Sequence, residues 1–445
     1  MAGRRVLAVI AGLAVAIAAG ALVRAALPAT AAGASYVRPP PPPPVGVFLR
    51  GGAPKHDARI EEALAGELPR LVFAGAQLAG RGALPDAERH ARVAALRTHA
   101  GFGDHGVALA GAWAALLDSL DRWLVLTTAD DAWEHACRDL RARADALTDQ
   151  LAAAELGYYL EPSLALDHPR RRAGIFTYRI DNVAFVRAGD RPVRVLDARR
   201  LDRLDPGVAL LGITAEELDD PVVLLDTVEA KVQAQVLPVL AGHPFPVTDD
   251  AWMFSARGRA AARAAGAAIR RELLAALYTD ADSAERAAIR CRQLVVASVR
   301  HHEAQHRLDQ DRGLVHPAVL GTRLGDRPDS PFGLRMRFEL SAYLSQLASD
   351  VWLPQLTLWN LVRHGLRRGA GRREEALVAV FVVEGLARKL GIPAAGDVLR
   401  NGEIDRDRLG DLATALAERT TVEVRSAAAA LWREHYGAPL VRLTD

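Results

Sequence analysis

The chain has 445 residues, carries 56 Lys and Arg against 54 Asp and Glu, and has hydrophobic side chains at 50% of its positions. This length and composition allow two or three domains with buried cores and exclude a disulfide-stapled miniprotein or a wholly disordered chain. The formal net charge of +2 also argues against a nucleic acid partner, because phosphate binding needs a clustered excess of basic side chains.

Residues 1–34 have the pattern of an export signal. Arg4 and Arg5 precede an apolar or small run over residues 6–23, which as a helix is about 27 Å long and nearly spans a bilayer. Small residues at positions 29–34 offer cleavage sites for a signal peptidase. The segment is therefore predicted to be either a cleaved signal peptide or a signal anchor.

Either form of this segment would export the rest of the chain. The arginine pair and the positive-inside rule place the N-terminus in the cytoplasm and the body in the periplasm or at the cell surface, with the membrane as a partner through the N-terminal helix. Residues 35–55 form a Pro-rich linker, in which Pro39–Pro44 can adopt only polyproline II and extends about 19 Å. We expect a stalk between the membrane and the body.

The next two segments differ in their hydrophobic period. Residues 56–157 have helical periodicity, with amphipathic stretches at 60–68, 107–124 and 132–156. Residues 158–246 are predicted to form a small antiparallel sheet followed by helices. The strands are expected at residues 176–180, 183–186 and 193–196, with turns at Asp181–Asn182 and Ala188–Asp190, and a helix is expected over Val222–Leu240.

The two cysteines, Cys137 and Cys291, are too few for a paired-cysteine zinc or iron–sulfur framework. They lie far apart in helical surroundings, so they are interpreted as two small buried apolar residues, with one disulfide as the alternative.

Residues 247–445 are predicted to be almost wholly helical and contain the segment that points to chemistry. Asp282 and Glu285 have the spacing of a capping box and Gly313 is a typical helix stop, which together predict one helix of roughly 30 residues. This helix contains the motif His-Glu-x-x-His at residues 302–306. Residues four apart share a helix face, so two imidazoles can bind one metal ion while Glu303 lies beside it.

The two histidines continue an apolar stripe that includes Val295 and Val299, which favours a position in the interior or in a cleft. The alternative is a polar patch on an exposed helix, in a stretch that also contains His301.

A hydrolytic zinc site normally has three protein ligands and a water, so two histidines leave one ligand missing. Ser330–Pro331 is a strong helix start, and a helix that folds back from there carries Glu339 toward the histidines. Asp309 and Glu384 are competing ligands. Asp309 is disfavoured because three ligands from one straight helix extend about 10 Å along its axis; it is expected to orient His306 or to cap a neighbouring helix.

These residues resemble the gluzincins, zinc metallopeptidases in which the His-Glu-x-x-His helix is followed by a second helix with a glutamate ligand. The resemblance covers about residues 282–350 and includes Leu308–Asp309 and Ala342–Tyr343. It departs from the thermolysin-like pattern, since Phe338 precedes Glu339 and Tyr343 follows it four residues later.

The resemblance implies that His302, His306 and Glu339 bind Zn²⁺ and that Glu303 is the general base and then the proton donor. The hydrophobic periods predict the fold class, a mainly α (α+β) protein with a small antiparallel sheet and an N-terminal membrane or signal helix, and the resemblance implies a multi-helix zincin-like metallopeptidase core in residues 247–445. Tyr343 and His364 are the candidates for the residue that stabilises the oxyanion.

The expected function is an exported, membrane-tethered zinc metallopeptidase that hydrolyses peptide bonds of a peptide or protein substrate. One alternative is a catalytically degenerate zinc-binding or scaffold protein of the cell envelope. Retention of Glu303 favours the enzyme, because a structural zinc site has no need of a base. Another alternative is a zinc-dependent amidase that acts on a non-peptide amide.

Overall fold

The computed structural model describes residues 53–69, 71, 85–126, 131–165, 172–202, 211–213, 220–246, 252–277, 283–313, 317, 319–321, 330–367, 373–393 and 398–445. The predicted N-terminal helix and the polyproline stalk lie outside these residues. Within them, no helix is both long enough and apolar enough to cross a membrane.

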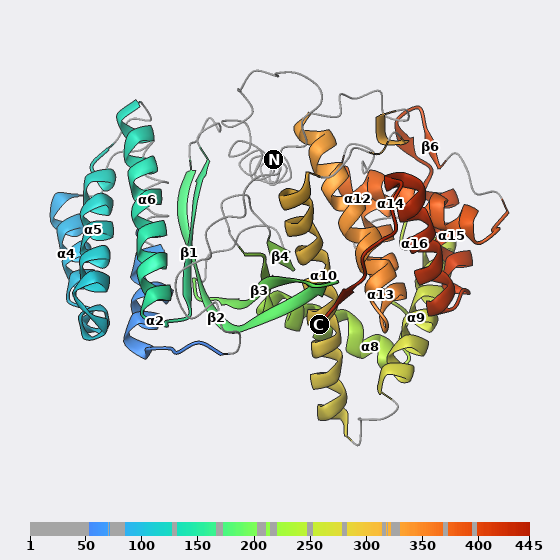
Figure 1. Cartoon of the computed structure of the whole chain (residues 1–445), viewed down its shortest axis with the longest axis horizontal. Coiled ribbons are helices and arrows are strands. Elements are labelled where there is room, and N and C mark those ends of the chain that lie inside the picture. The colour runs from blue at the N-terminus through green and yellow to red at the C-terminus, as the bar shows by residue number, and fades with distance from the viewer. Residues whose placement is uncertain are drawn as a thin grey trace. The chain divides into compact units, whose positions relative to one another are not determined.

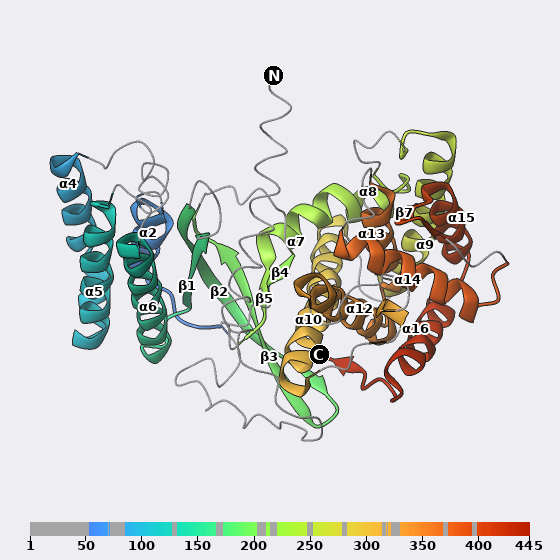
Figure 2. The same cartoon turned by 90° about the horizontal axis from the view of Figure 1, so that it is seen from above.

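The chain divides into two compact units, one with residues up to 184 and 196–210, the other with residues 185–195 and 211–445. Both are drawn in Figure 1, and Figure 2 gives a second view. The described part is mainly helical with a small sheet, which confirms that much of the predicted fold class. The sheet is mixed, whereas the sequence predicted an antiparallel one.

The first unit is a set of helices followed by strands. Its helices are α2 (Ala58–Ala65), α4 (Asp86–Arg97), the 3₁₀ helix η2 (Ala100–His105), α5 (Val107–Leu124) and α6 (Asp131–Ala153). Its core is aromatic and aliphatic: Trp123 and Trp133 are fully buried, and the Trp123 indole donates to the Cys137 Sγ at 3.1 Å. Cys137 and Cys291 are both buried and neither forms a disulfide, so the disulfide alternative is wrong.

The strands begin in the first unit. They are β1 (Tyr158–Ala165), β2 (Arg172–Ala188) and β3 (Arg191–Arg200), and β1 pairs antiparallel with the first part of β2. Gly189, at φ +63°, makes the tight turn from β2 to β3 where the sequence predicts one.

The predicted turn at Asp181–Asn182 is wrong, because β2 runs through both residues without a break. Their side chains bind across the hairpin: Asp181 accepts from Arg199 at 2.8 Å, and Asn182 donates to Asp197 at 2.9 Å. These cross-strand bonds satisfy turn-forming side chains within an extended strand.

The second unit begins at the tip of this hairpin and continues with β4 (Gly212–Ile213), β5 (Val222–Leu224), α7 (Leu225–Lys231), the π-helix η3 (Val232–Val236) and α8 (Leu237–Leu240). The strand order is β1-β2-β3-β5-β4, and β8 (Leu443–Thr444) pairs with the end of β2. Residues 222–224 were predicted to start a helix; they form a fully buried strand instead, and the helix begins at Leu225.

The rest of the second unit is a helical bundle. Its remaining elements are α9 (Ala256–Leu277), α10 (Ala284–Arg312), α12 (Pro331–Ser349), α13 (Pro354–Leu366), α14 (Glu374–Lys389), β6 (Leu399–Arg400), β7 (Glu403–Ile404), α15 (Arg406–Ala417) and α16 (Thr421–Tyr436). α14 lies at the centre, with residues 376–383 all buried. Figures 1 and 2 both show α10 and α12 side by side, in agreement with their many contacts.

Candidate metal centre

Local sequence determines where the two helices of the site begin and end. The Ser283 side chain accepts from Arg286 N and caps α10, so the cap is Ser283 and not the predicted Asp282, which lies outside the described residues. Gly313, at φ +66°, ends α10 as predicted. Ser330 caps α12 by accepting from Gly333 N, and Pro331 is its first residue, also as predicted.

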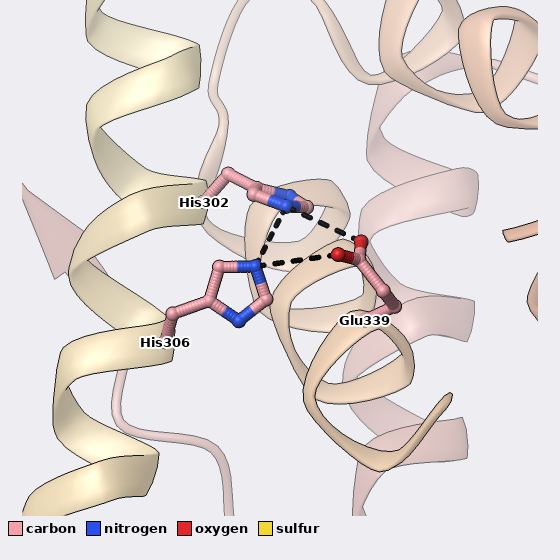
Figure 3. Close-up of side chains that lie close together, drawn as sticks. All are labelled: His302, His306 and Glu339. Carbon is pink, nitrogen blue, oxygen red and sulfur yellow. Dashed lines mark hydrogen bonds and ion pairs between the residues drawn. The ribbon is translucent and has the colours of Figure 1, made fainter. Parts of the chain in front are cut away.

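The packing of α12 against α10 brings His302, His306 and Glu339 together. Figure 3 shows the two imidazoles of α10 and the carboxylate of α12 pointing toward one another. His302 Nε2 lies 3.1 Å from His306 Nε2 and 3.6 Å from Glu339 Oε2, and His306 Nε2 lies 3.8 Å from Glu339 Oε1. The ligand atoms all lie within 4.8 Å of one another.

These distances fit a zinc ion. Ligands at 2.0–2.1 Å from a tetrahedral zinc are separated from one another by about 3.3 to 3.4 Å, so small side-chain movements complete the site. In the part of the chain that the structure describes, this is the one group of three or more His, Cys, Asp or Glu side chains close enough to share a metal ion.

The electrostatics of the three side chains favour one bound positive charge. Burial opposes ionisation of Glu339, but the two imidazoles overcome it and lower the pKa of its carboxyl to about 2. Burial and the charge of His302 lower the pKa of His306 to about 4. Burial opposes a charge on His302 as well, yet Glu339 raises its pKa. A carboxylate and two imidazoles thus surround a place for one cation.

The three side chains of the site are largely buried but remain partly exposed to solvent. The side chains of His302, His306 and Glu339 are 13%, 12% and 26% exposed. A structural zinc site usually has four protein ligands and is closed, whereas a catalytic one keeps a position for water. Three ligands with partial exposure match the second kind.

Glu303, the predicted base, is buried on a neighbouring face of α10 and packs against β4. A Cβ atom on Gly212 of β4 would lie 2.4 Å from Glu303 Oε1, so the two residues are in direct contact. Gly212 was not foreseen, since a strand of two residues carries no periodic pattern. The charge of Glu303 also raises the pKa of both His302 and Tyr343, in agreement with a place beside the ligands.

Tyr343 and His364 both lie near the ligands. The Tyr343 ring makes an edge contact with the His302 ring at a centroid distance of 4.7 Å, and burial and then Glu339 raise its pKa. Burial and Arg367 lower the pKa of His364 to about 4, while Glu339 opposes this shift. Both side chains are therefore uncharged at neutral pH and can donate a hydrogen bond.

Lys231 is a further cation that the sequence analysis missed. It is the last residue of α7, and burial together with the charge of Arg363 lowers its pKa to about 7. The charge of Lys231 also lowers the pKa of His364.

The competing ligands have other roles. The buried Asp309 carboxylate accepts from Gln305 Nε2 at 2.6 Å and from Ser341 Oγ, and so joins α10 to α12 instead of reaching the ligand group. The sequence predicted that Asp309 would orient His306 or cap a neighbouring helix, and the observed contacts differ from both. Glu384 accepts from Val398 N at 2.7 Å.

Asp309 should give the protein a characteristic pH dependence of stability. Burial raises its pKa from 3.8 to about 7. Because the pKa is higher in the folded protein, Asp309 contributes stability that is fully present below about pH 4. This contribution to the free energy of unfolding, at most about 4 kcal/mol, is lost as the pH rises through about 7. With chelator present, Asp309→Asn should flatten this part of the profile of thermal unfolding against pH. Identical profiles for both proteins would contradict the assignment.

In comparisons with known proteins, no protein-family model matches the chain, and no curated protein or solved structure is significantly similar to it.

Proposed function

We propose that the chain is a zinc metallopeptidase of the gluzincin type, with His302, His306 and Glu339 as the zinc ligands and Glu303 as the general base. The observation that carries this proposal is the convergence of the three ligand atoms within 4.8 Å, with Glu303 outside the group but near enough for its charge to raise the pKa of His302. A structural site gains nothing from a buried carboxylate that does not bind the metal.

When bound, zinc supplies a positive centre that activates water and polarises a carbonyl group. Glu303 accepts a proton from the attacking water and passes it to the nitrogen of the leaving amine. Tyr343 and His364 are the candidate donors to the carbonyl oxygen as it gains negative charge.

The edge of the sheet supports a peptide as the substrate. β4 is last in the strand order, and it pairs with β5 at Gly212↔Val223 and Ile213↔Val222. Among the described strands none pairs with its other edge, and Glu303 packs against this strand at Gly212. An extended peptide can add to such an edge through main-chain hydrogen bonds, whereas a compact non-peptide amide cannot.

The location of the enzyme follows from its N-terminal sequence. Export and tethering by residues 1–34 would place the catalytic unit in the periplasm or at the cell surface, where its substrates would be peptides or proteins of that compartment.

Digestion of casein and a peptide library by the purified chain, with and without a zinc chelator, tests the proposal. We expect cleavage that the chelator abolishes and added Zn²⁺ restores. A chain that binds zinc and cleaves nothing would favour the scaffold or amidase alternatives.

Gly212→Ala tests the contact between β4 and the base. The new Cβ would meet Glu303 Oε1 at 2.4 Å and Glu303 Cδ and Cγ at 2.6 Å, so the whole end of this side chain, including the carboxylate, must move. A displacement of about 1 Å can lower a rate about 100-fold. The peptidase assay should show this loss with unchanged zinc content. Gly111→Ala, at a position with no atom within 4 Å of the new Cβ, is the control; equal rates for the two variants would contradict the contact.

A further inference from the structure

A chain of buried polar side chains leads from the ligand His302 into the helical bundle. His302 Nδ1 lies 3.2 Å from Gln346 Oε1, and Gln346 Nε2 donates to Ser298 Oγ at 2.9 Å. Ser298 Oγ lies 3.4 Å from Thr357 Oγ1. Gln346, Ser298 and Thr357 are 7%, 5% and 4% exposed, so water has little access to this chain.

The orientation of the Gln346 amide determines which nitrogen of His302 carries the proton. The Gln346 NH₂ group donates to Ser298, so the Gln346 oxygen faces His302 Nδ1. His302 Nδ1 must then carry a hydrogen and donate it to that oxygen. The lone pair of a neutral His302 is left on Nε2, the atom that faces His306 and Glu339. A metal ion needs that lone pair.

The chemistry of the acceptor also matters. Histidine ligands of metals commonly donate to a carboxylate or a backbone carbonyl, and a carboxylate makes the imidazole more basic. A glutamine oxygen orients the ring equally well but adds no negative charge. The Ser298 hydroxyl accepts the N–H of the Gln346 amide and could instead donate its own hydrogen to a carboxylate at this position.

We propose that Gln346, held by Ser298, is a positioning residue that fixes the tautomer and ring orientation of His302 for zinc. This inference rests on the proposed function, because it assumes that His302 is a zinc ligand. It adds a specific residue that neither touches the metal nor belongs to the His-Glu-x-x-His motif.

Three variants of the full chain separate this role from simple packing. Gln346→Leu fills a similar volume without an acceptor, Gln346→Glu restores the acceptor, and Ser298→Ala removes the hydroxyl that holds the amide. Gln355→Leu is the matched control, because Gln355 is also a buried amide, 4% exposed, that donates to Leu416 O and Arg419 O away from the site.

The measurement is the affinity for Zn²⁺ in competition with a chromogenic chelator, which needs no substrate. Loss of an outer hydrogen bond to a histidine ligand weakens metal binding 10- to 100-fold, and we expect about this loss for Gln346→Leu. Gln346→Glu should bind Zn²⁺ at least as tightly as the wild type. Ser298→Ala should lie between Gln346→Leu and the wild type, and Gln355→Leu should equal the wild type.

Wild-type affinity in Gln346→Leu would overturn the inference, as would equally weak binding by Gln346→Leu and Gln346→Glu. If Gln346→Leu does not fold, the other two variants test the inference. Weak Zn²⁺ binding by Gln346→Glu, or wild-type affinity in Ser298→Ala, would overturn it. Absence of Zn²⁺ binding by the wild type would instead refute the proposed function, so the two failures are distinguishable.

Discussion

Glu303→Gln should keep the fold and the zinc of the parent and lower the rate of peptide hydrolysis by about 100-fold or more. Glutamine is close to glutamate in size, so it can take the same buried place against Gly212. It cannot accept the proton of the attacking water, and therefore the contribution of general acid–base catalysis is lost. Rates on a cleaved library peptide, measured beside zinc content and thermal unfolding, check the prediction.

The control for this experiment is Glu384→Gln, which alters another buried glutamate of the second unit. Glu384 accepts a hydrogen bond from Val398 N and lies outside the ligand group. This variant should keep both zinc and the parental rate, even if its stability falls. Equal rates for Glu303→Gln and the parent would leave the scaffold alternative as the better account.

Removal of one ligand should have the largest effect on the metal. His302→Ala and Glu339→Gln each leave two ligands where three converge, and we expect the affinity for Zn²⁺ to fall by more than about 100-fold, beyond the loss typical of an outer hydrogen bond. After dialysis, both variants should retain little zinc by elemental analysis, against about one zinc per chain in the parent.

Asp309→Asn is the companion variant. Asp309 accepts from Gln305 and Ser341 and lies outside the ligand group, so its replacement should leave the zinc content unchanged. Loss of zinc in Asp309→Asn with retention in Glu339→Gln would exchange the roles of the two acidic residues.

Zinc should also stabilise the fold, since it binds only where α10 and α12 are packed together. A ligand at 100 times its dissociation constant adds about 2.7 kcal/mol to the free energy of unfolding. The parent should therefore unfold at a higher temperature with Zn²⁺ than with chelator, and His302→Ala should show almost no difference.

The helix ends of the site could be predicted because caps and stops are local. Ser330, Pro331 and Gly313 act through their own hydrogen bonds and backbone angles, and each lies where the sequence places it. The place of Glu339 followed from those ends, because a helix that restarts at Pro331 and returns along α10 brings this residue to the two histidines.

The sheet was harder to predict, because pairing between distant residues overrides local preference. Asp181 and Asn182 favour a turn on their own, but partners across the hairpin keep them in a strand. The apolar residues 222–224 have no alternation that separates a buried strand from a helix start, and only the partner strand β4 decides it.

Two residues near the ligand group also depend on contacts between distant parts of the sequence. Gly212 contacts Glu303 from a strand far away in the sequence, and nothing near it indicates this contact. Gln346 could have been found, since Glu339, Tyr343 and Gln346 follow one stripe of α12 at helical spacing. Its role depends on Ser298 of α10, which only the packed structure reveals.

Anomalous diffraction from crystals of the purified chain, recorded on both sides of the zinc absorption edge, tests the central claim most directly. We predict one strong peak per chain between His302 Nε2, His306 Nε2 and a Glu339 carboxylate oxygen, at about 2.0 to 2.2 Å from each. The Glu303 carboxylate should lie next to the peak without binding it. A zinc-loaded crystal with no peak between these three side chains, or with its peak on other residues, would contradict the account.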